Sequence, residues 1–178
     1  RRLPLQWLLG LGRLLGIIWY YLVPIRVRVA KSNARQVFSG RKTEREICGL
    51  VRDACIFQSI NALECLAIMN LCDDAAHSRF TLHGVETYRN ALARGRGVCV
   101  TSLHLGNFEQ SIALIAAQGF TLNIIYRRLG WGALHDYWNL VRESFGIQAI
   151  SHRKSRDEIR AALQRGESVG FACDQHMP

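Results

Sequence analysis

The stretch VCVTSLHLGNFEQSIALIAAQGF, residues 98–120, has the pattern of a strand followed by a helix. Gly106 and Asn107 lie between the two halves and permit a tight turn, with Asn107 as the predicted N-cap of the helix. Two ionisable residues stand at this turn: His104 follows the apolar run, and Glu109 lies five residues further on. They are either a catalytic pair or two unrelated polar residues of a loop.

Strands and helices alternate around and after this stretch. Strands are predicted at residues 79–84, 97–103, 121–126, 147–151 and 168–173, and helices at 86–95, 107–118, 134–145 and 155–165. Such strict alternation favours an α/β fold with a largely parallel sheet and helices on both faces. In open sheets of this kind, ligands bind beyond the carboxyl ends of the strands. His104 and Asp174 are both predicted at such ends.

A long amphipathic helix is predicted before the sheet, over residues 43–72. Thr43 and Glu46 have capping-box spacing, and apolar residues follow at helical intervals. The helix is either continuous or broken near Asn61. Four of the six cysteines fall in this segment and none forms a C-x-x-C pair, so we expect neither a zinc site nor a disulfide framework.

Residues 1–25 are predicted to form a helix that anchors the chain to a membrane. Their apolar part, Leu3 to Val23, would make a helix about 31 Å long, which matches the thickness of a bilayer core. Aromatic residues flank this segment at both ends, and several basic residues follow it. This distribution of positive charge places the remainder of the chain on the cytoplasmic side of the membrane.

Arg13, in the middle of the apolar segment, leaves the mode of anchoring open. An arginine at the bilayer centre costs about 2.5–3.5 kcal/mol on insertion scales. A helix that lies flat in the interface avoids this cost, so the helix either spans the membrane or lies on it. The alternative, a helix buried in the protein core, leaves the flanking aromatic residues and arginines unexplained.

The net charge of +9 indicates an anionic partner, which is a membrane surface, an acidic protein or nucleic acid. Basic residues at 127–128 and 153–156 could follow nucleic-acid phosphates, but no recognised nucleic-acid-binding motif accompanies them. An amino terminus that is anchored to a membrane also argues against a role in binding nucleic acid. We therefore expect no nucleic-acid partner.

The spacing of His104 and Glu109 occurs a second time in His152 and Asp157, also at a strand-to-helix junction. Three basic residues and a serine separate the second pair, and the helix dipole alone explains an aspartate in a first helical turn. The turn between His104 and Glu109 would bring the carboxylate back beside the imidazole. A carboxylate on one ring nitrogen fixes the tautomer and raises the basicity of the other nitrogen. The alternative is a capped turn with a hydrogen-bonded histidine.

No serine or cysteine near His104 has the context of a nucleophile elbow. If the pair is catalytic, the attacking group comes from a substrate, such as a hydroxyl that His104 deprotonates. Acyl transfer to an alcohol meets this requirement without a covalent intermediate.

Four segments resemble the bacterial lipid A biosynthesis acyltransferases, the late lauroyl and myristoyl transferase family of the lysophospholipid acyltransferase-like superfamily. They are ARGRGVCVTSLHLGNFE, NIIYRRL, FGIQAI and AALQRGESVGFACDQ, and the amino-terminal region up to Phe38 is similar as well. Their order and spacing are more specific than any one segment. The resemblance implies a membrane-associated transferase that moves an acyl chain from an acyl carrier protein thioester to a hydroxyl of a phosphorylated lipid A precursor.

The resemblance also implies roles for individual residues. His104 is expected to be the general base and Glu109 its partner. Arg127 would contact the anionic substrate or polarise the thioester carbonyl, with Arg128 as the alternative, and Asp174 would be a supporting polar residue. The substrate-binding residues expected from the motifs are Gly106, Asn107, Arg127 and Asp174. No metal and no cofactor are expected, because the acyl thioester is itself a substrate.

The partners that the resemblance implies are an acidic acyl carrier protein, an anionic lipid acceptor and the bacterial inner membrane, with the catalytic domain on its cytoplasmic side. The family continues beyond the position of Pro178, so we expect the acyltransferase domain over residues 26–178 to be incomplete at its carboxyl end. Two alternatives stay open. One is an inactive or truncated lipid-binding remnant of the same fold, and the other is acylation of another glycolipid or phospholipid from acyl coenzyme A.

Overall fold

The computed structural model describes residues 4–67, 81–126 and 132–174, and of Lys154 the backbone alone. The chain divides into two compact units, Arg1–Ala67 and Ile68–Pro178. The first unit is helical, and the second contains the sheet.

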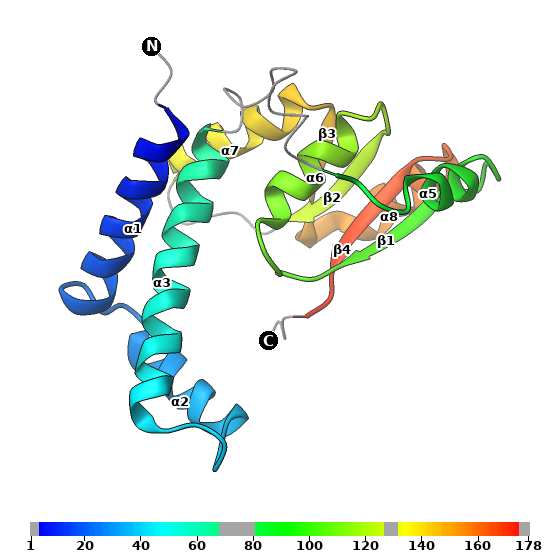
Figure 1. The fold of residues 1–178 in the computed structure, drawn as a ribbon. Helices are drawn as coiled ribbons and strands as arrows, with labels where there is room; N and C mark the ends of the chain where they lie inside the picture. Colours follow the sequence, from blue (N-terminus) through cyan, green and yellow to red (C-terminus); the bar gives the residue numbers. More distant parts are fainter. Residues whose placement is uncertain (1–3, 68–80, 127–131, 175–178) are drawn as a thin grey trace. The chain divides into compact units, whose positions relative to one another are not determined.

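The helices of the first unit are α1 (Leu5–Tyr21), α2 (Val27–Val37) and α3 (Glu44–Ala67). Helices α1 and α3 pack side by side (Figure 1). Gly16 of α1 allows the close approach, because a Cβ atom there would lie 2.3 Å from the Cα atom of Ile56. A Cβ atom on Gly12 would lie 2.8 Å from Cγ1 of Ile60. Glycines one turn apart therefore set the distance between these two helices.

Helix α3 is continuous through Asn61, which is buried. Its amino terminus has the predicted capping box. The Thr43 amide donates to Glu46 Oε2 at 2.8 Å, and the Glu46 amide donates to Thr43 Oγ1 at 3.4 Å. The last five residues of the predicted helix, 68–72, lie outside the described residues.

Helix α2 is not predicted from the sequence. Val27 is its buried residue and packs with Val51 of α3, whereas most of the helix is polar or basic. Arg26 precedes the helix in the left-handed conformation, with φ at 59°. The Trp19 Nε1–H group donates to the Ile25 carbonyl at 3.0 Å. This side-chain contact across six residues helps to fix the corner between α1 and α2, and the periodicity of the sequence does not reveal it.

The predicted membrane anchor corresponds to α1, which has 17 residues. Within the described parts of the chain, none of the helices has both the length and the apolar character needed to cross a membrane. Large apolar side chains of α1 and of the corner that follows it are exposed: Trp7, Leu11, Leu14, Leu15, Ile17, Tyr21, Leu22, Val23 and Ile25. Anchoring by residues 1–25, and a domain boundary before residue 26, stay predictions.

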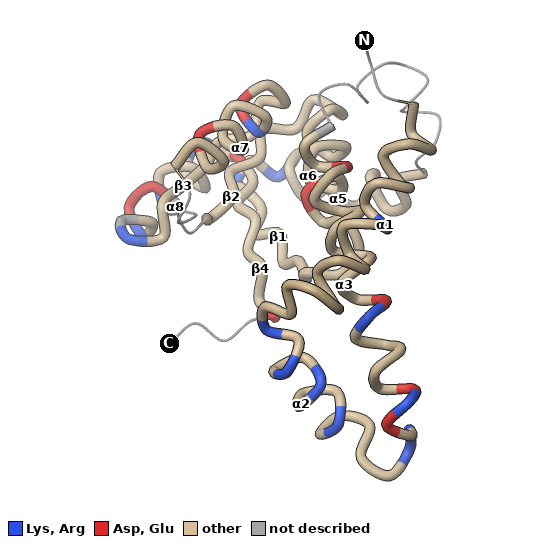
Figure 2. The backbone as a smooth tube through the Cα atoms, turned by 90° about the vertical axis from the view of Figure 1, so that its left-hand side faces the viewer, with Lys and Arg blue, Asp and Glu red and all other residues tan. Residues whose placement is uncertain are grey.

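The second unit contains, in chain order, α5 (Val85–Leu92), β1 (Val98–Ser102), α6 (Phe108–Ala116), β2 (Leu122–Tyr126), α7 (Gly132–Ser144), β3 (Ile147–Ser151), the 3-10 helix η2 (His152–Lys154), α8 (Ser155–Gln164) and β4 (Ser168–Ala172). The described strands form a parallel sheet in the order β1-β4-β2-β3. Helices α6 and α8 lie on opposite faces of this sheet (Figures 1 and 2). The predicted α/β fold with a parallel sheet is confirmed.

The prediction of a strand at residues 79–84 is wrong for residues 81–84, the part that the structure describes. Residues 81–84 form a loop that leads into α5. Gly84 has a φ of 78° directly before the helix, and this left-handed conformation is incompatible with a strand. The apolar alternation here is too short to compete with the start of the helix.

Strand β4 lies inside the sheet between β1 and β2, and its first residue, Ser168, is fully buried. Next to it, the buried Asn123 side chain donates to the Ser168 carbonyl at 3.0 Å. An apolar cluster joins α6, β2 and β3 through Ala116, Ile124 and Ile147. These contacts fix the strands in register, so their carboxyl ends form one edge.

Candidate active site

His104 stands two residues beyond the carboxyl end of β1, at the start of the predicted turn. Gly106 has a φ of 65°, a conformation that favours glycine. Asn107 is the N-cap of α6, and its side-chain oxygen accepts a hydrogen bond from the Gln110 amide at 3.3 Å. The turn and its cap are therefore as predicted.

Asp174 stands two residues beyond the carboxyl end of β4, the strand next to β1. Ser102 is paired with Ala172 at the ends of these strands, and the Cys173 amide donates to the Ser102 carbonyl at 3.0 Å. The two chain segments therefore leave the sheet side by side. This register brings Asp174 directly to His104.

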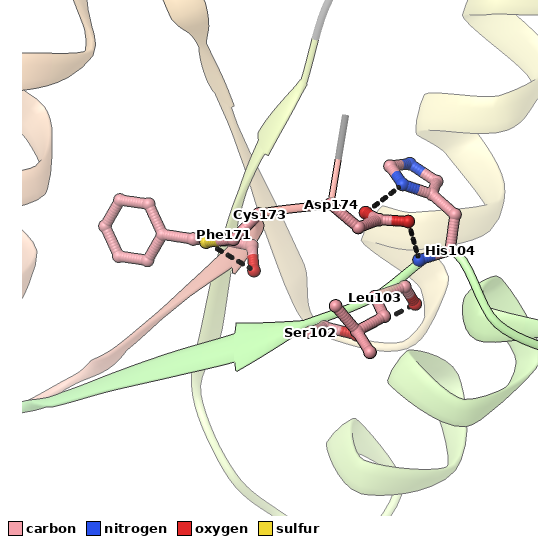
Figure 3. A network of polar contacts seen from close by, with 6 residues as sticks. All are labelled: Ser102, Leu103, His104, Phe171, Cys173 and Asp174. Carbon is pink, nitrogen blue, oxygen red and sulfur yellow. Dashed lines mark hydrogen bonds and ion pairs between the residues drawn. The ribbon is translucent and has the colours of Figure 1, made fainter. Parts of the chain in front are cut away.

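The Asp174 carboxylate holds His104 at two points (Figure 3). Nδ1 of the His104 ring lies 2.8 Å from Oδ1, and the His104 backbone amide donates to Oδ2 at 3.0 Å. An ionised carboxylate only accepts hydrogen bonds, so Nδ1 carries the proton in this contact. In the neutral ring, Nε2 then has the free lone pair that a general base needs.

The hydrogen bond from the His104 ring has the largest effect on the pKa of Asp174 and holds it below its ordinary value. Desolvation opposes this effect, and the backbone amide of His104 lowers the pKa by a smaller amount. Asp174 is therefore ionised under neutral conditions. The side chains of His104 and Asp174 are 31% and 29% exposed, so the pair is open to a substrate. Phe108 lies edge-on to the imidazole, with 4.7 Å between the ring centroids.

Glu109 has a different partner from the one expected. The sequence predicts that its carboxylate orients His104, but in the structure it forms an ion pair with Arg142 of α7. Arg142 Nε donates to Glu109 Oε2 at 3.2 Å, and Nη2 donates to Oε1. The carboxylate against the imidazole belongs to Asp174, and the first-turn residue of α6 that lies beside the ring is Phe108.

The predicted arginines, Arg127 and Arg128, lie outside the described residues, so their contact with a substrate stays a prediction. The strand that leads to them ends at Tyr126, whose ring stacks on His135 of α7 at 5.3 Å between centroids. His135 is buried, and its Nε2 atom lies 3.1 Å from Nδ2 of Asn139.

Arg142, Asn139 and His135 are not identified from the sequence as residues near the site. They lie on one helix without a motif, and only the packing of α7 shows their partners. Leu103 and Leu105, which flank His104 in the sequence, are 55% and 80% exposed, and this exposure emerges only from the structure. In the described part of the chain, no group of three or more histidine, cysteine or acidic side chains could hold a metal ion.

The model of the bacterial lipid A biosynthesis acyltransferase family matches residues 1–178. The match spans the helical unit and the sheet unit alike, and it confirms the resemblance drawn from the sequence. None of the curated proteins matches the chain.

Proposed function

Because the chain belongs to the bacterial lipid A biosynthesis acyltransferase family, we propose that it moves a fatty acyl chain from an acyl carrier protein thioester to a hydroxyl of a lipid A precursor. The observation that carries this proposal is the contact between His104 and Asp174 at the carboxyl edge of the parallel sheet. Such a pair provides a base with a fixed tautomer at the edge where ligands bind in folds of this class.

In the proposed reaction, Nε2 of His104 accepts the proton of the acceptor hydroxyl while the hydroxyl oxygen attacks the thioester carbonyl carbon. The tetrahedral intermediate collapses, the carbon–sulfur bond breaks, and the thiolate leaves with the proton from the imidazolium. The products are an ester and a thiol. Asp174 stabilises the imidazolium that forms between these two steps, because its carboxylate accepts the Nδ1 hydrogen bond.

The remaining predicted residues have roles around this pair. The turn at Gly106 and Asn107 lies between His104 and α6, where its backbone could bind substrate. Arg127 is proposed to contact the anionic substrate or to stabilise the carbonyl oxygen as negative charge develops there. Glu109, the acidic residue in the first turn of α6, supports the turn through its ion pair with Arg142.

The proposed partners are the acidic carrier protein, the anionic lipid acceptor and the cytoplasmic face of the inner membrane. Helix α2 and the residues on either side of it have a dense set of positive charges (Figure 2), namely Arg26, Arg28, Lys31, Arg35, Arg41, Lys42 and Arg45. The exposed apolar residues of α1 and of the corner belong to the same unit. Positive charge beside exposed apolar surface favours an anionic membrane over nucleic acid.

The experiment that tests the proposal measures acyl transfer by membranes that contain the chain. The donor is a labelled acyl carrier protein thioester and the acceptor is a lipid A precursor. Transfer should be lost in His104→Ala and kept in His152→Ala, a matched control because His152 also follows a strand. The same assay with acyl coenzyme A distinguishes the two donors. A folded, membrane-bound wild type that transfers nothing from either donor would refute the proposal and favour a lipid-binding remnant.

A further inference from the structure

We infer that Arg142 is a positioning residue for the site: by holding Glu109, it fixes the first turn of α6 and thereby the turn that presents His104. The inference rests on the proposed function for its effect on turnover. Its structural part, that Arg142 controls the placement of the imidazole, can be tested without turnover.

The ion pair between Arg142 and Glu109 is well shielded from solvent. The two side chains are 14% and 13% exposed, and two guanidinium nitrogens donate to the two carboxylate oxygens. The other arginine–carboxylate pairs in the described residues have at least one partner that is much more exposed. Exposed pairs contribute little, whereas loss of one member of a shielded pair leaves a charge without compensation. Glu109 would have to move if Arg142 were absent.

Movement of Glu109 would reach His104 through a short chain of contacts. Glu109 directly follows Phe108, whose ring lies edge-on against the imidazole. Asn107, the N-cap, is the residue before Phe108. The position of Glu109 therefore affects both the cap that closes the turn and the ring that packs on His104.

Helix α7 is a suitable support for this contact. Val141, next to Arg142, packs against Ala113 of α6. At the other end of α7, His135 stacks on Tyr126 at the carboxyl end of β2. One helix thus touches two of the segments at the edge of the sheet where the site lies. Helix α7 therefore contacts α6 in two ways: Arg142 forms the ion pair with Glu109, and Val141 makes the apolar contact with Ala113.

The test compares Arg142→Met and Arg142→Lys with the control Arg165→Met. Arg165 also binds a glutamate with two nitrogens, but its partner, Glu167, lies at the amino end of β4, away from the site. We expect Arg142→Met to lower kcat by about 100-fold, the cost of a misplaced catalytic group, with KM for the acyl donor unchanged. Arg142→Lys should recover part of kcat, and Arg165→Met should leave it unchanged.

A second readout is the chemical shift of the His104 ring in protein labelled at histidine, assigned with His104→Ala. It should change in Arg142→Met and not in Arg165→Met, whether or not the chain turns over. The inference is overturned if Arg142→Met leaves the ring shift as in wild type, or if Arg165→Met changes it equally. An inactive wild type whose His104 shift still responds to Arg142→Met would refute the proposed function and support the positioning role.

Discussion

The hydrogen bond between His104 and Asp174 joins two segments that are far apart along the chain. The turn at Gly106 and the cap at Asn107 follow from local preferences, and both occur as predicted. The sequence predicts Asp174 at the same edge as His104, but not in contact with it. The contact depends on β4 lying beside β1, and these strands are 65 residues or more apart along the chain. Local spacing instead favours Glu109 as the partner of His104, but in the structure Glu109 pairs with Arg142.

The lowered pKa of Asp174 has a consequence for stability that can be measured. Its folded-state pKa lies below the unfolded value because of the hydrogen bonds from His104. The stabilisation is therefore fully present above the unfolded pKa and is lost as the pH falls through the folded pKa. Urea unfolding should show wild type more stable than Asp174→Asn at neutral pH, with the difference vanishing only below the ordinary range of an aspartate.

A difference in unfolding free energy that stays constant down to strongly acidic pH would contradict the assigned role of the Asp174 carboxylate.

At the scale of helices and strands, periodicity predicts well the elements that pack on a large core. The strand at 147–151 is as predicted, and the predicted helix at 155–165 is α8 to within one residue. The sequence prediction fails at residues 81–84, which form a loop instead of a strand, and at helix α2, which is not predicted. In both cases a residue in the left-handed conformation precedes a helix, Arg26 before α2 and Gly84 before α5. Such features have no period in the sequence.

The packing of α1 on α3 leads to a prediction about glycines. Gly16→Ala should destabilise the helical unit by about 1–3 kcal/mol, because its Cβ atom would overlap the backbone of Ile56. Gly10→Ala is the matched control, since a Cβ atom on Gly10 meets nothing within 4 Å. That change should stabilise α1 by about 0.5–1 kcal/mol through helix propensity. Urea unfolding followed by circular dichroism measures both, and equal effects of the two variants would contradict the close packing.

For the molecule as a whole, the sequence predicts the class of the fold but not its strand order. Alternating strands and helices specify a parallel sheet, whereas the order β1-β4-β2-β3 depends on contacts between distant segments. The overall charge of +9 predicts an anionic partner without identifying it. The exposed apolar residues of the helical unit now favour a membrane as that partner.

Membrane binding through the helical unit can be tested with vesicles. We expect the chain to bind vesicles that contain anionic lipid and to be released in part by salt. Arg26→Glu with Arg28→Glu should weaken binding at least about tenfold, since each basic residue at an anionic surface contributes about 1 kcal/mol. The same charge change in α8, Arg156→Glu with Arg160→Glu, is the control. Equal weakening by both double variants would show that net charge, and not this surface, drives the binding.

The most direct test of the site is a double-mutant measurement of kcat for acyl transfer. His104→Ala should lower kcat by about 100-fold or more, as expected for loss of a general base. Asp174→Asn should also lower it, because the imidazole loses the carboxylate that orients it. If the two residues act as one unit, the double variant should be no slower than His104→Ala alone. Losses that multiply in the double variant would contradict the account, because Asp174 would then act independently of His104.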